Sequence, residues 1–110
     1  MLISRWIDSY TRQQRMVEDL TKKIAARCET AVWGRIHHQA SHMDPAQAAG
    51  YIRARAALVI QREVQLATRN LAESTDSLIA RVTESTSNVI VRRMMAAIAT
   101  QPPTELRRAA

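Results

Sequence analysis

The sequence predicts an all-α protein in which long antiparallel helices, two or three per chain, pack as an elongated bundle that a second chain completes. Apolar residues recur at intervals of three, four or seven along most of the chain, which is the spacing of one helix face. Only two glycines and three prolines interrupt the 110 residues. The chain has no Phe and is rich in Ala, so helices can approach closely although each contact buries little area.

Charge and cysteine content restrict the class of protein. The formal net charge is +6, which favours an acidic partner, although an Arg-rich and Ala-rich composition is also typical of a GC-rich bacterial genome. The single cysteine, Cys28, excludes an intrachain disulfide and indicates a reducing compartment. Arg5 and Asp8 interrupt the apolar residues at the start of the chain, so no secretory signal peptide is expected there. The longest apolar run, residues 56–60, is too short to span a bilayer. We therefore expect a cytoplasmic protein with no membrane partner.

Two prolines near the end of the sequence set the expected domain boundary. Residues 1–101 are expected to form a single helical domain. Pro102 and Pro103 should end its last helix, because proline has no amide hydrogen to donate and its ring clashes with the preceding turn. Residues 102–110 are then expected to form a flexible tail.

The first helix is predicted from about Ser4 to Gly34. The apolar residues along it keep helical spacing: Ile3, Trp6, Tyr10, Val17, Leu20, Ile24, Cys28 and Ala31. Beside this stripe, acidic residues precede basic residues by four positions, which indicates a solvated outer face. Gly34 could end the helix as a residue with positive φ, or the helix could continue to Gln39.

The start of the second helix is the clearest boundary in the sequence. Asp44 is a favourable N-cap, Pro45 suits the first helical position, and Gln47 stands where a capping box places its partner. Gly50 lies near the start of this helix, and no helix-breaking residue follows it until Pro102, so residues 45–100 could form one helix of about 80 Å. We favour a turn near residues 74–77, where Ser, Thr and Asp can cap a third helix, although the apolar phase continues across it.

Three histidines, His37, His38 and His42, are the candidates for metal or enzyme chemistry. His38 and His42 would lie one turn apart on a helix, a spacing that can chelate a metal, and Asp44 could add a carboxylate. No HExxH pattern accompanies them. The favoured interpretation is a connection with solvated histidines, and no metal, cofactor or catalytic residue is predicted. Cys28 lies on an apolar stripe and is expected to be a buried core residue rather than a nucleophile.

Arg55, Arg62 and Arg69 repeat every seven residues and so lie on one stripe of the second helix. A stripe of this kind can bind phosphates. The arginines can also flank a helix–helix contact, with the aliphatic parts of their side chains over apolar neighbours. Glu73, four residues after Arg69, favours this second interpretation. The alternative function that the stripe predicts is weak, sequence-independent nucleic-acid binding.

Two apolar belts predict an oligomer. Five consecutive apolar residues, 56–60, cover most of a helix circumference, and residues 89–91 with Met94 and Met95 repeat the pattern. One chain of this length has too few helices to cover both belts, so we expect an obligate homo-oligomer, most simply a dimer. The interface is predicted to contain Ala56, Val59, Ile60, Val64, Leu71, Val89, Ile90 and Met94. The sequence thus predicts a structural or protein-interaction module, not an enzyme, whose protein partner is unidentified.

Overall fold

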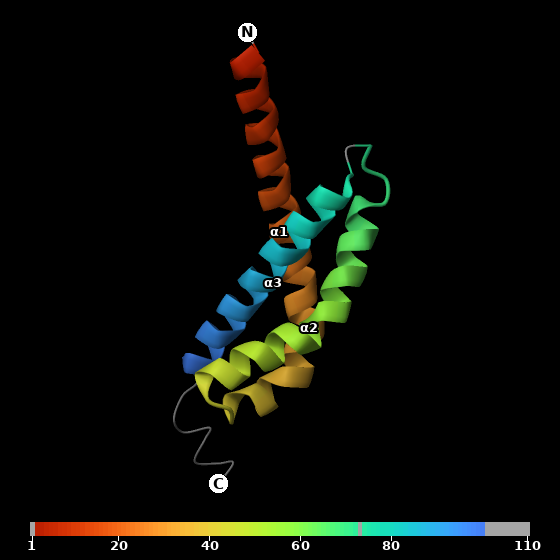
Figure 1. Ribbon diagram of the computed structural model, residues 1–110. Helices are drawn as coiled ribbons and strands as arrows, with labels where there is room; N and C mark the ends of the chain where they lie inside the picture. The colour runs from red at the N-terminus through yellow and green to blue at the C-terminus, as the bar shows by residue number, and fades with distance from the viewer. Residues whose placement is uncertain (1, 73, 101–110) are drawn as a thin grey trace.

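Three α-helices, α1 (Leu2–Ser41), α2 (Pro45–Thr68) and α3 (Asp76–Ala99), form the fold. The computed structural model describes residues 2–72 and 74–100; the expected tail, 102–110, lies outside these residues. Each helix packs against the other two, and α2 runs antiparallel to α1 and α3 (Figure 1). The chain measures 65 × 25 × 19 Å, which confirms the elongated all-α bundle. None of the helices in the described residues combines the length and apolar content needed to cross a membrane.

The connection between α1 and α2 forms where the sequence places a helix start. Of the two ends considered for the first helix, the structure has the later one: α1 passes through Gly34, which has no positive φ, and ends at Ser41. Asp44 is the N-cap of α2, and its carboxylate accepts hydrogen bonds from the backbone N–H groups of Ala46 at 3.0 Å and Gln47 at 3.1 Å. Pro45 takes the first helical position, where its missing amide hydrogen costs nothing.

A turn separates α2 from α3, as the sequence favoured. α2 ends at Thr68, and the N-cap of α3 is Thr75, whose hydroxyl accepts a hydrogen bond from the backbone N–H of Leu78 at 3.1 Å. Leu71 lies inside this turn and is half-buried. α2 and α3 each present a stripe of buried residues at every fourth position to one shared core.

The core consists of side chains spaced four residues apart. In α2 the buried positions are Ala48, Ile52, Ala56, Ile60, Val64 and Thr68, and in α3 they are Leu78, Val82, Thr86, Ile90 and Met94. With 3.6 residues per turn, each step of four advances the stripe by about 40° around the helix. Such rows interdigitate when helices cross at an angle, whereas a heptad seam alternates steps of three and four.

The single chain buries much of both apolar belts, although Leu58 in the first belt is 78% exposed. Five of the eight residues assigned to an intermolecular interface are at most 1% exposed within the single chain: Ala56, Ile60, Val64, Ile90 and Met94. The other three, Val59, Leu71 and Val89, are half-buried. Because the helices of one chain bury the first group against each other, a second chain packed on this bundle would not contact them.

Two threonine hydroxyls in this core lack a hydrogen-bond partner in the described part of the chain. They are the Oγ1 atoms of Thr21 and Thr86, and these residues are 4% and 0% exposed. By contrast, the hydroxyl of the half-buried Thr83 donates to the backbone carbonyl of Ile79 at 2.7 Å. A buried hydroxyl without a partner costs roughly 1–3 kcal/mol, so these two positions lower the stability of the bundle.

Replacing Thr86 by valine should therefore stabilise the protein. Thr86→Val keeps the shape of the side chain and removes the unpaired hydroxyl, so the free energy of unfolding should rise by about 1 kcal/mol. Urea denaturation followed by circular dichroism measures this change. Thr83→Val is the matched control and should give no such gain, because it removes a hydroxyl that has a partner. A loss of stability in Thr86→Val would mean that its hydroxyl is paired in the folded protein.

Candidate interaction surfaces

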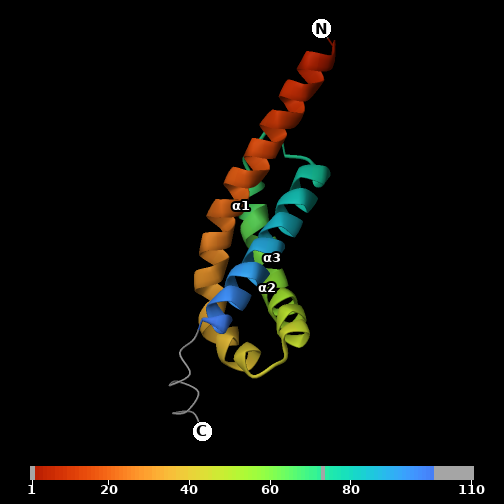
Figure 2. The same ribbon diagram turned by 90° about the vertical axis from the view of Figure 1, so that its left-hand side faces the viewer.

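α1 is much longer than the helices that cover it. It has 40 residues, whereas α2 and α3 have 24 each, a difference of about 24 Å at 1.5 Å per residue. The first buried side chain of α1 in the described residues is that of Val17, and residues 5–15 are all exposed. We call residues 5–15 the arm. Figures 1 and 2 show it projecting past the turn between α2 and α3.

One face of the arm is apolar and open to solvent. Trp6 is 71% exposed, Ile7 51% and Tyr10 56%, and the rings of Trp6 and Tyr10 stack with centroids 6.2 Å apart. At about 100° per residue, these side chains lie on the same side of α1 as Val17 and Thr21, which are buried. The arm therefore continues the core-facing stripe of α1 beyond the ends of α2 and α3.

Hydrogen bonds join the C-terminal end of the arm to α3. The guanidinium of Arg81 donates to the side-chain oxygen of Gln14 at 2.6 Å and to that of Gln13 at 3.5 Å. These contacts lie where the first side chains of α1 become buried. They orient the arm relative to the bundle but leave its apolar face uncovered.

The solvent face of α2 is basic and carries exposed leucines. The predicted stripe of Arg55, Arg62 and Arg69 is exposed throughout, and the leucines between them, Leu58 and Leu66, are 78% and 48% exposed. We call these five residues the basic face of α2. Arg69 is the C-cap of the helix, so the stripe continues just past its last turn.

Two acidic side chains near the core pair with arginines that lie outside the basic face of α2. Glu63, the one acidic residue in α2, pairs with Arg27 of α1 at 3.9 Å. Glu29 of α1 lies 3.4 Å from Arg93 of α3. The pairing of Arg69 with Glu73 that the sequence suggested lies outside the described residues. Within the part of the chain that is described, Arg55 and Arg62 have no carboxylate partner.

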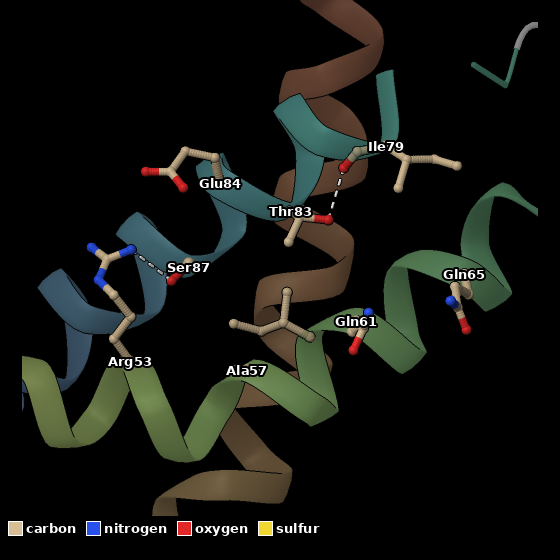
Figure 3. A pocket seen from close by; sticks show the side chains of 9 residues that line it. Arg53, Ala57, Gln61, Gln65, Ile79, Thr83, Glu84 and Ser87 are labelled. Carbon is tan, nitrogen blue, oxygen red and sulfur yellow. Dashed lines mark hydrogen bonds between the residues drawn. The ribbon is translucent and has the colours of Figure 1, made fainter. Parts of the chain in front are cut away.

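A groove of about 380 Å³ lies between α2 and α3, and Figure 3 shows it from close by. Arg53 reaches across one end and donates to the side-chain oxygens of Ser87 at 2.9 Å and Asn88 at 2.8 Å. Ile60 and Ile79 supply apolar lining, and Glu84 points away from the centre of the groove (Figure 3). Its lining residues include the carboxylate of Glu84 and the hydroxyl groups of Thr83 and Ser87, but no His or Cys.

The three histidines do not come together as metal ligands. His37 Nδ1 lies 2.7 Å from the backbone carbonyl oxygen of Trp33. The imidazole ring of His37 stacks on the indole ring of Trp33 with their centroids 4.9 Å apart. The rings of His38 and His42 meet edge to face, also at 4.9 Å. No group of three His, Cys, Asp or Glu side chains in the described residues is placed to hold a metal ion, and Asp44 caps α2 instead.

Cys28 is fully buried on the core stripe of α1. Burial and, to a lesser extent, the negative charge of Glu63 raise the pKa of its thiol from 9.0 to about 11. Because the thiolate is the nucleophile, this environment opposes reactivity at neutral pH.

In the folded protein, Cys28 should therefore react slowly with a thiol reagent such as dithionitrobenzoate at neutral pH. The rate should increase toward pH 11, as the thiolate fraction rises. The same protein in concentrated urea should react completely and quickly, which controls for the integrity of the thiol. Rapid stoichiometric labelling of the folded protein at pH 7 would contradict this account of the site.

Comparison with known proteins leaves the surfaces as the guide to function. No protein-family model matches the chain, and neither a curated protein nor a solved structure matches it significantly. The arm, the basic face of α2 and the groove between α2 and α3 are the features from which function is inferred.

Proposed function

We propose that the protein is an interaction module that forms a homodimer through the apolar face of its arm. The observation that carries this proposal is the exposure of Trp6, Ile7 and Tyr10 on a face of α1 that is buried between Val17 and Val32. The dimer therefore uses surface that the chain leaves uncovered on the arm, and not the positions of α2 and α3 that its own core buries.

Water is an unfavourable environment for this face. An aromatic side chain buries about 150–250 Å² when it packs, and more than half of each of the two arm aromatics is exposed. Contiguous apolar patches of this kind mark interaction sites. A helical segment of about 12 residues is also only marginally stable by itself in water, so a partner helix along the arm would stabilise the arm as well as cover it.

A second copy of the chain is the occupant that suits the arm. A closed two-fold contact joins one patch to the same patch on the partner, and it is the commonest oligomeric arrangement. The arm meets the requirement for self-pairing because its charged residues lie on the opposite side from the apolar face at about 100° per residue: Arg5, Asp8, Arg12 and Arg15. Two apolar faces can thus meet without bringing like charges together.

The size of the arm determines how strong this dimer is. Eleven residues extend about 16 Å, so the seam between two arms is short. We therefore expect a reversible dimer. The chain also has its own core, so this proposal replaces the obligate oligomer that the sequence suggested with an assembly of already folded chains.

Trp6→Ala combined with Tyr10→Ala should abolish the dimer and leave the bundle folded. Both substitutions favour helix and remove the apolar surface, so the mass by sedimentation equilibrium should stay that of a monomer at concentrations where the wild type associates. Circular dichroism should show unchanged helix content.

Asp8→Ala combined with Arg12→Ala is the matched control. It changes the same number of exposed residues on the opposite side of the arm and should leave association unchanged. A wild-type protein that remains monomeric to millimolar concentration would refute the dimer, and a dimer that survives the loss of both aromatics would refute the arm as its interface.

The basic face of α2 supports a second candidate function, sequence-independent binding to nucleic acid. Its three arginines are exposed and lie on one side of the helix, where phosphates along a backbone could contact them. Binding of this kind depends on counterion release. Three phosphate contacts give a slope of about −2.7 in log affinity against log salt, or a roughly 40-fold loss between 50 and 200 mM salt.

Neutralising this face should remove such binding. The triple variant Arg55→Gln, Arg62→Gln and Arg69→Gln should reduce both the affinity for random duplex DNA and the salt slope, as measured by fluorescence anisotropy. The control triple Arg5→Gln, Arg12→Gln and Arg15→Gln removes the same charge from the arm. If both triples weaken binding equally, net charge alone is responsible, and this candidate function fails.

A further inference from the structure

The last turns of α1 and the first turns of α2 enclose a second groove, on a different side of α2 from the one in Figure 3. Its volume is about 480 Å³. Three side chains that can carry positive charge line it: Arg35 and His38 from α1 and Arg55 from α2. Its lining includes no carboxylate, and neither arginine is paired with one among the described residues.

Contacts within the groove orient Arg55. The guanidinium carbon of Arg55 lies 5.5 Å from the centroid of the Tyr51 ring, a distance at which a cation is attracted to the ring face. The Tyr51 hydroxyl donates to the side-chain oxygen of Gln39, so the NH₂ group of that amide is left as a donor. Arg55 is thereby oriented through a chain of contacts that joins both helices, which reduces the ordering cost of binding a ligand.

The floor of the groove is apolar. Val32 and Ile36 of α1 are each 3% exposed, and Val59 of α2 packs beside them. The volume lies within the roughly 300–1,000 Å³ typical of small-molecule sites. A ligand that fits this groove carries an anionic group for the two guanidiniums and an apolar or planar part for the floor.

We propose that this groove binds a small organic phosphate of about the size of a mononucleotide. Guanidinium groups recognise phosphoryl oxygens in paired, directional hydrogen bonds, which a carboxylate-free pair of arginines leaves available. Arg35 and Arg55 approach the phosphoryl group from two different helices, and the floor formed by Val32, Ile36 and Val59 contacts the organic part. The site does not require the dimer, because all of its residues come from one chain.

Calorimetric titration of the full chain with three probes tests the two parts of this site. Adenosine monophosphate should bind, inorganic phosphate should bind more weakly, and adenosine should not bind measurably. Equal binding of adenosine and its monophosphate would overturn the proposal, because the arginines would then contribute nothing. Failure of the monophosphate to bind at about 10 mM would also overturn it.

Single substitutions locate the site. Arg35→Gln and Arg55→Gln should each weaken binding of adenosine monophosphate by about tenfold or more, the effect of losing a charge-assisted hydrogen bond. Arg92→Gln is the matched control, because it removes the same charge from an exposed position of α3 outside the groove, and it should leave the affinity nearly unchanged. All three side chains are exposed, so the variants should keep the wild-type circular dichroism. An equal loss in Arg92→Gln would show binding to general positive charge and refute the groove as the site.

Discussion

The shared core of this bundle can be no longer than its two shorter helices, and the rest of the structure depends on this mismatch of length. α2 and α3 bury one line of side chains each, at every fourth position, and α1 supplies the third side only where they run beside it. Beyond Val17 toward its N-terminus, α1 keeps its apolar face but has no helix in the described residues to pack against it. The buried core and the exposed arm are therefore two parts of one continuous stripe.

The local signals in the sequence predicted most of the fold. Asp44 followed by Pro45 located the start of α2, and the Ser-Thr-Asp cluster located the cap of α3, because capping depends on a few neighbouring residues. What covers an apolar face depends instead on helix lengths and on how the chain turns back. Periodicity alone therefore could not show that Ile60 and Ile90 pack within one chain while Trp6 and Tyr10 do not. The greater length of the first helix compared with the other two was the feature of the sequence that could have indicated the arm.

The distribution of charge follows from the same packing. Glu29 and Glu63 lie at the edges of the core, where they pair with Arg93 and Arg27 across helix boundaries. The outer side of α2 keeps its arginines without such partners in the described residues. Spacing alone predicted the stripe containing Arg55, but the convergence of Arg35 with Arg55 in one groove requires the crossing of α1 and α2, which no local pattern encodes.

The central claim is that the apolar face of the arm is open in the single chain and covered when two chains meet. The fluorescence of Trp6, measured against protein concentration in a Trp33→Phe background, tests this claim most directly because it reports the environment of the arm alone. The account predicts emission typical of a water-exposed indole in dilute solution and a blue shift as the concentration rises through the dissociation constant. Emission that stays at the water-exposed wavelength at every concentration, or that is blue-shifted even at the greatest dilution, would contradict it.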